Sequence, residues 1–188
     1  MFKKILLNFF FTIVFVSYSF SVFANDKKNI IDKLKNINSL KFNFNQKTND
    51  LTEIGICYLY FPGKLKCNYN SADQKEIIIN KSSLVIIKKK YDKKYYYPIS
   101  KSPFLKILNK KELIKLIKKG NIEYQNNRLS LVNIFDDQVI TIFFGKKNFD
   151  FSGWEVTDQF GKKISFSIKI LSVNDEIDIK MFKIPNLN

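Results

Sequence analysis

Apolar and polar residues alternate along most of this 188-residue chain, with the period of two that is typical of half-buried β-strands. The first alternating run begins at Leu40 and reaches about Thr48, and the polar stretch 49–53 predicts a turn after it. Shorter runs predict a succession of further strands over residues 76–80, 84–88, 95–99, 122–125, 129–134, 139–144, 154–158, 164–171 and 177–182.

A hairpin is predicted over residues 55–69, because Pro62-Gly63 at its centre favours a tight turn. In its second arm, Leu65, Cys67 and Tyr69 alternate with polar residues and therefore point to one face. We expect that face of the hairpin to line an interior and the other face to meet solvent.

Helical spacing replaces the alternation in two places. After a cap at Asn25 or Asp26, apolar residues such as Ile30 and Leu34 recur on one face until about Asn38.

The second helical region lies in the middle of the chain. Ser102-Pro103 is a good helix start, and a further helical piece over residues 110–119 stops at Gly120. Strands in succession with helices only near the start and the middle indicate an α+β fold, mostly β, built on one antiparallel sheet.

The first 24 residues have the pattern of a secretory signal peptide. Lys3 and Lys4 precede an apolar run over residues 5–16, and a small-x-small-like cleavage site follows at residues 22–24. An uncleaved membrane anchor would share the apolar run, but polar residues interrupt it. We expect export, cleavage after Ala24, and a single mature domain over residues 25–188.

The net charge of the chain is +15, and removing residues 1–24 with their two lysines leaves +13. A charge this high is typical of nucleic-acid-binding proteins. Export and the even spread of lysine along the chain argue against that class, so no nucleic-acid partner is expected. An anionic membrane surface or an acidic protein fits the expected location better.

The chain contains no histidine, which removes the commonest general base and the imidazole metal ligands. The adjacent acids Asp136-Asp137 and Asp175-Glu176 fall in predicted turns, where such pairs are usually solvated. The sequence therefore predicts a protein that is not an enzyme and that holds no metal or cofactor.

Cys57 and Cys67 stand at mirrored positions about Pro62 and would point to the same face of the hairpin. Two nearby thiols tend to pair in an oxidising compartment. They could equally be two small apolar residues of the interior, because a disulfide requires strict Cα spacing.

Five segments in chain order resemble the family of periplasmic outer-membrane lipoprotein carrier proteins, LolA. They are residues 39–46 with Phe44-x-Gln46, the hairpin 55–69, residues 97–104 with Leu108, residues 154–161, and Asn174 with Ile177 and residues 182–185.

The resemblance implies an incomplete, unclosed antiparallel β-barrel with a helical lid over an apolar cavity. It further implies a monomeric periplasmic chaperone that receives acylated lipoproteins from an inner-membrane ABC transporter and passes them to an outer-membrane acceptor. Under this interpretation, the candidate acyl-chain-binding residues are those predicted to face the cavity. From the sheet they are Leu40, Phe42, Phe44, Leu59, Phe61, Leu65, Tyr69, Ile79, Leu84, Ile86 and Tyr97, and from the lid Ile30, Leu34, Phe104, Leu108, Leu113 and Ile117.

Phe61 departs from the family pattern, which has arginine immediately before the hairpin proline to tie the barrel to the lid. We expect Phe61 to hold the lid by apolar contact instead. The main alternative function is an exported, non-enzymatic domain that binds lipopolysaccharide or a cell-wall polymer through its basic surface.

Overall fold

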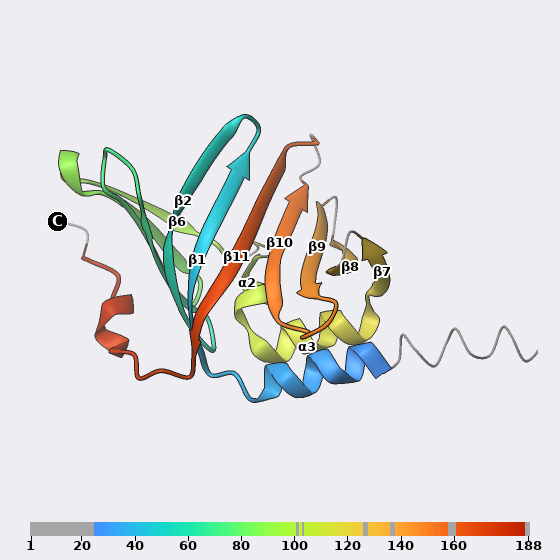
Figure 1. The fold of residues 1–188 in the computed structure, drawn as a ribbon. Coiled ribbons are helices and arrows are strands. Elements are labelled where there is room, and N and C mark those ends of the chain that lie inside the picture. The colour runs from blue at the N-terminus through green and yellow to red at the C-terminus, as the bar shows by residue number, and fades with distance from the viewer. Residues whose placement is uncertain are drawn as a thin grey trace, which may run out of the picture.

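The computed structural model describes residues 25–100, 102, 104–125, 128–135, 138–157 and 161–186, and its centre is one curved antiparallel sheet (Figure 1). The eleven strands lie in the order β6-β5-β4-β3-β2-β1-β11-β10-β9-β8-β7. Their bounds are β1 Ser39–Thr48, β2 Leu51–Tyr60, β3 Lys64–Tyr69, β4 Lys75–Asn80, β5 Ser83–Lys88, β6 Lys93–Pro98, β7 Asn121–Gln125, β8 Arg128–Phe135, β9 Gln138–Gly145, β10 Phe151–Thr157 and β11 Lys163–Val173. In the described chain no pairing joins β6 to β7, which confirms an unclosed, mostly β fold.

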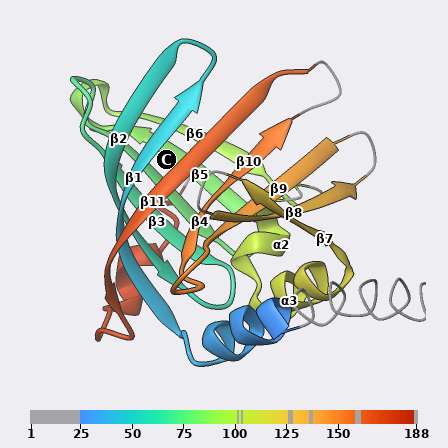
Figure 2. The same cartoon turned by 45° about the vertical axis from the view of Figure 1, so that its right-hand side comes forward.

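Three helices lie together at one end of the sheet, inside its curve (Figure 2). They are the N-terminal helix, described over residues 25–35, with α2 (Phe104–Leu108) and α3 (Lys110–Lys119). Two short 3₁₀ turns, η1 (Lys89–Tyr91) and η2 (Ile179–Phe182), complete the elements. Among the described residues, no helix has the length and hydropathy needed to cross a bilayer.

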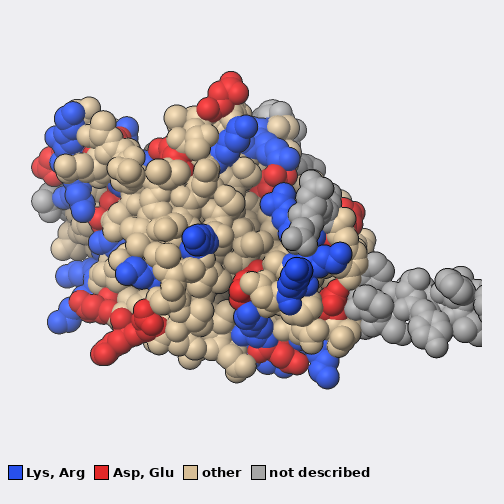
Figure 3. Space-filling model, viewed as in Figure 1, with Lys and Arg blue, Asp and Glu red and all other residues tan. Residues whose placement is uncertain are grey.

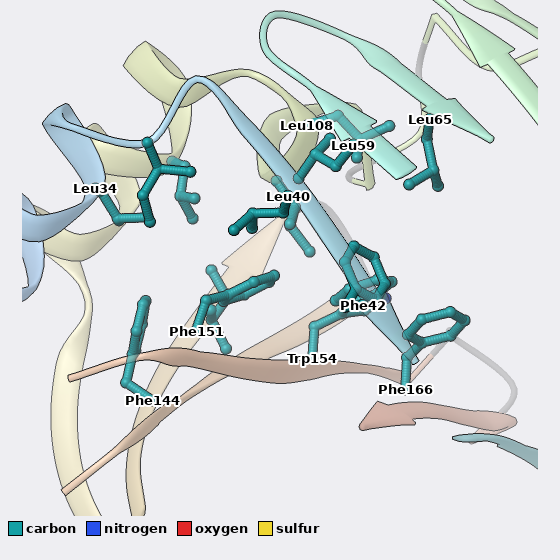
Figure 4. Packing of buried hydrophobic residues seen from close by; sticks show 14 of the residues in the cluster. Leu34, Leu40, Phe42, Leu59, Leu65, Leu108, Phe144, Phe151, Trp154 and Phe166 are labelled. Atoms are coloured by element: carbon teal, nitrogen blue, oxygen red, sulfur yellow. The ribbon is translucent and has the colours of Figure 1, made fainter. Parts of the chain in front are cut away.

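The core forms between the helices and the concave face of the sheet. On β1 the alternation puts Leu40, Phe42 and Phe44 on that face, where each is at most 4% exposed. Helix residues such as Leu34 and Leu108 point toward them (Figure 4). The sequence signals that set the sheet's inner face therefore also define the surface that the helices cover.

Helix α3 has the bounds that its flanking residues predict. The Asn109 side-chain oxygen accepts hydrogen bonds from the backbone N–H groups of Lys111 at 3.0 Å and Glu112 at 3.4 Å. At the other end, the Gly120 N–H donates to the Leu116 carbonyl at 2.7 Å and closes the last turn.

Two predicted elements are wrong in detail. The turn after β1 is confined to residues 49–50, because β2 continues the ladder from Leu51, opposite Thr48. The strand expected over residues 177–182 does not form, and η2 takes its place with the Asp178 carboxylate accepting from the Lys180 N–H at 2.9 Å.

The segment after β11 crosses the sheet on the face opposite the core. Phe182 is fully buried there, and its carbonyl accepts a hydrogen bond from the Asn80 side chain at 3.2 Å. Asn80 follows Ile79, which faces the core, so alternation places Asn80 on the outer face. Several predictions lie outside the described residues: the signal peptide over residues 1–24, Pro103, and the turns at residues 126–127 and 136–137.

Candidate functional site

Most of the predicted cavity residues come together in one hydrophobic cluster between the sheet and the helices. Of the seventeen, thirteen belong to this buried cluster and the partly buried Leu84 and Phe104 pack against it, whereas Ile86 and Tyr97 do neither. Ile86 is half-buried on β5 and Tyr97 is 48% exposed on the edge strand β6. The helices therefore cover the middle of the concave face and leave its β5–β6 side partly open.

The prediction from sequence missed the other half of the same surface. Trp154 on β10 stacks on Phe166 of β11 with ring centroids 4.3 Å apart, and Phe166 stacks on Phe44 at 4.8 Å. Figure 4 shows Phe144 and Phe151 beside them. The alternation over residues 139–144 is the signal that could have found this half, since Ile140, Ile142 and Phe144 all prove to face the core.

The helices fill the concave face in this structure. Ile30 of the N-terminal helix, Leu108 of α2 and Ile117 of α3 are each at most 1% exposed, so their side chains occupy the space over the sheet. An apolar guest can reach this surface only where the helices move away from it.

Several polar contacts that fix the helices lie on the surface. The Lys27 ammonium donates to the Lys118 carbonyl at 3.2 Å, and Lys33 forms an ion pair with Asp150 of the turn before β10. These contacts are solvent-exposed, and exposed ion pairs typically stabilise by at most about 1 kcal/mol. The apolar contacts therefore dominate the attachment of the lid, by which we mean residues 25–35, α2 and α3.

Lys110, at the start of α3, joins three segments where the lid meets the hairpin turn. Its ammonium donates to the Lys35 carbonyl at 3.2 Å and to the Asn38 side-chain oxygen at 3.1 Å. It also lies 5.7 Å from the centre of the Phe61 ring, within reach of a cation–π contact. Burial lowers the pKa of Lys110, as expected for an ammonium partly removed from water.

Phe61 itself is 8% exposed and belongs to the core cluster. Two residues later, the Gly63 N–H donates to the Leu108 carbonyl at 2.8 Å, which links the hairpin turn directly to the end of α2. Three contacts therefore hold the lid on the hairpin turn: the Gly63–Leu108 backbone hydrogen bond, the packing of the Phe61 ring, and the Lys110 ammonium. This cation belongs to the lid and not to the sheet.

A polar group borders the apolar surface at the end away from the helices. The Tyr69 hydroxyl donates to the Gln46 side-chain oxygen at 2.7 Å, and the Lys75 ammonium lies 3.8 Å from the centre of the Tyr69 ring. Lys75 also forms an ion pair with Glu53. Burial, helped by the Glu53 charge, raises the pKa of Tyr69, so the phenol stays protonated and can donate this bond.

Cys57 and Cys67 form a disulfide across β2 and β3, with the sulfur atoms 2.01 Å apart. The two residues are direct cross-strand partners and are at most 2% exposed. The disulfide faces the core and links β2 to β3 in the part of the sheet that the lid covers, and it leaves no reactive thiol there.

Comparison with known proteins gives consistent matches. Residues 35–185 match the sequence model described as outer membrane lipoprotein carrier protein LolA. The outer-membrane lipoprotein carrier protein of Francisella tularensis subsp. novicida (strain U112) is 32% identical over 149 residues, which cover 73% of this chain and 70% of the relative. The protein of the same name from Francisella tularensis subsp. tularensis (strain SCHU S4 / Schu 4) matches with the same values.

Among solved structures, an uncharacterized conserved protein from Thermus thermophilus shares the fold with a TM-score of 0.53. Its sequence is 7% identical, and the match covers 86% of this chain and 94% of that one. The match to the family model extends over most of the chain and includes the open sheet, its disulfide-bonded hairpin and helices α2 and α3. The chain belongs to the outer membrane lipoprotein carrier protein LolA family.

Proposed function

We propose that this protein is a periplasmic chaperone that binds the acyl chains of lipoproteins and carries them from the inner to the outer membrane. The observation that carries the proposal is an apolar sheet surface covered by helices whose polar attachments are largely exposed. Membership of the LolA family and the names of the Francisella relatives support the same role. The donor is then an inner-membrane ABC transporter, and the recipient is an acceptor at the outer membrane.

The energetics of the lid make reversible loading feasible. Burying one methylene contributes about 0.8 kcal/mol, so one long acyl chain contributes on the order of 10 kcal/mol. The lid buries at least six large apolar side chains: Ile30, Leu34, Leu108, Leu113, Leu116 and Ile117. At about 1.5–3 kcal/mol each, their burial is of the same order. Exchanging lid for acyl chain is therefore close to balanced, which permits both uptake and release.

A release assay tests the proposal. The mature protein is incubated with inner membranes that hold a triacylated lipoprotein and its ABC transporter, and the soluble fraction is examined for a one-to-one complex. We expect the acylated lipoprotein to appear there, and a cargo whose acylated cysteine is replaced by serine gives no complex. Failure to hold any acylated protein in solution would contradict the carrier role.

The high positive charge of the chain supports a second candidate function, which is electrostatic binding of an anionic envelope component. Such binding weakens steeply as salt is added, because surface charges are screened within about 8 Å at physiological ionic strength. Binding that depends on burial of acyl chains does not weaken when salt is added. A complex with acylated cargo that persists at high salt therefore supports the carrier role over this alternative.

A further inference from the structure

The partly open side of the concave face, at β5 and β6, continues an ordered pattern of residues that begins on the buried strand β4. Cross-strand partners on this face form three rows, and the two nearer the helices are apolar. The rows are Ile79–Leu84–Tyr97, Ile77–Ile86–Tyr95 and Lys75–Lys88–Lys93.

The third row brings three cations side by side on the face that lines the core. Lys75 stacks on Tyr69, a core residue, which fixes its direction. Lys88 and Lys93 lie two positions from Ile86 and Tyr95 along their strands, so alternation puts them on the same face as those residues. We call this set, Lys75, Lys88 and Lys93, the lysine row.

Like charges placed directly opposite each other destabilise a sheet, so the lysine row needs compensation. Lys75 has Glu53, and Lys88 has Asp73 at 3.1 Å. Lys93 is exposed, and among the described residues it has no ion pair. The Lys88–Asp73 pair is also partly exposed, with the Lys88 side chain 39% accessible, so an incoming anion can replace Asp73 at little cost.

We infer that the lysine row binds an anionic head group whose acyl chain lies along the two apolar rows. This inference rests on the proposed acyl-binding function and adds a preference for charge. Tyr95 and Tyr97 are 39% and 48% exposed, so their rings can contact the part of the acyl chain next to the head group without any movement of the lid. The ligand class is a single-chain or double-chain lipid with a phosphate or carboxylate within a few ångströms of its acyl chain.

The experiment compares lipids that differ only in head-group charge. Palmitoyl lysophosphatidylglycerol and palmitoyl lysophosphatidylcholine form one pair, and palmitate and hexadecanol form the other, all below their micelle concentrations. Binding to the mature protein is followed by the fluorescence of Trp154, the one tryptophan of the chain, which lies buried in the core. The first pair tests a phospholipid as the source of the anion, and the second tests a free fatty acid.

We expect the anionic member of at least one pair to bind about tenfold tighter than its uncharged or zwitterionic partner, with the ratio shrinking as salt is added. In the double variant K88Q/K93Q the ratio falls to about one, while the affinity for the neutral partner is unchanged. The matched control K146Q/K147Q removes two exposed lysines from the turn between β9 and β10 and keeps the ratio. Equal affinities within both pairs, or a ratio unchanged in K88Q/K93Q, would overturn the inference and leave the carrier role intact. Binding of no lipid at all would overturn both.

Discussion

The concave face of the sheet has two parts that differ in what covers them. In the covered part, Leu40 and Leu59 on β1 and β2 are at most 2% exposed, because the helices pack on them. In the open part, Tyr95 and Tyr97 on β6 are 39% and 48% exposed. The inward positions nearer the helices are apolar in both parts, so the difference in exposure there comes from the reach of the lid.

This difference separates two roles that an apolar surface can have. Burial under the lid stabilises the empty protein. In the open part, apolar area stays exposed to water, and a bound guest can cover that area. The outward face over β1, β2 and β11 is different again, since Figure 3 shows a broad region there with few charged groups. The following substitutions test the comparison between the covered and the open part.

The largest effect is expected in the covered part, for Phe42→Ala. Phe42 is 1% exposed, and truncating a fully buried phenylalanine costs about 3–5 kcal/mol of unfolding free energy. Chemical denaturation of the mature protein measures this loss. A loss below about 1 kcal/mol would mean that the lid does not pack on β1 as described.

Glu76→Gln gives the next effect, on the outer face behind the open part. Burial on its own raises the pKa of Glu76, but ion pairs with Lys89 at 2.7 Å and Lys66 at 3.1 Å outweigh it and hold the pKa below the usual 4.5. A carboxylate with a lowered folded-state pKa stabilises the protein at neutral pH, and this contribution is lost as the pH falls through that pKa.

At pH 7 we expect the variant to lose about 1.5–3 kcal/mol, as for a hydrogen bond to a charged group. Thermal unfolding measured from pH 7 down to pH 3 should show a weaker dependence on pH in the variant than in the natural protein. Parallel curves for the two proteins would show that the pKa of Glu76 is the same in the folded and the unfolded protein, which would contradict this prediction.

Lys110→Met acts on the lid itself. The substitution keeps an apolar stem but removes the donors to the Lys35 carbonyl and the Asn38 side chain, which weakens closure by about 1 kcal/mol. Because lid closure competes with the guest, acyl-chain affinity should rise by about fivefold as stability falls. Lys111→Met, at the exposed neighbouring position, is the control and should change neither value. Lower affinity in the Lys110 variant would show that the cation contacts the guest instead.

Tyr97→Ser is expected to have the smallest effect on stability, within about 0.5 kcal/mol, because the ring is half in water. Its effect on acyl-chain affinity should be a loss of about fivefold if the open part receives the guest. Ile134→Ser, at a residue 73% exposed on β8, is a control that should leave affinity unchanged. Identical acyl-chain affinity in Tyr97→Ser and Ile134→Ser would show that the open part does not belong to the binding surface.

The sequence allowed much of the fold to be predicted, because period-two runs depend on local residues alone. The alternation of Leu40, Phe42 and Phe44 gave β1 and its buried face, and Gly120 gave the end of α3. The segment over residues 177–182 misled because its apolar residues also alternate, although Phe182 alone among them is buried and Ile179 is 48% exposed.

The site was less accessible to prediction from sequence. Which strands the helices cover depends on contacts between segments far apart in the chain, so Tyr97 and Ile86 were assigned to the same cavity as Leu40. The lysine row requires the register of three strands, and no single segment shows it. Lys110 as a lid contact requires the α2–α3 junction to meet the hairpin turn, which only the folded chain shows.

The central claim is that acyl chains take the place of the helices on the sheet. Spin labels at Lys115→Cys on α3 and Lys169→Cys on β11, both exposed, report the distance between lid and sheet, since the native cysteines are joined in a buried disulfide. On addition of a triacylated peptide, we expect this distance to increase by one helix diameter, about 10 Å. An unchanged distance with the peptide bound would contradict it.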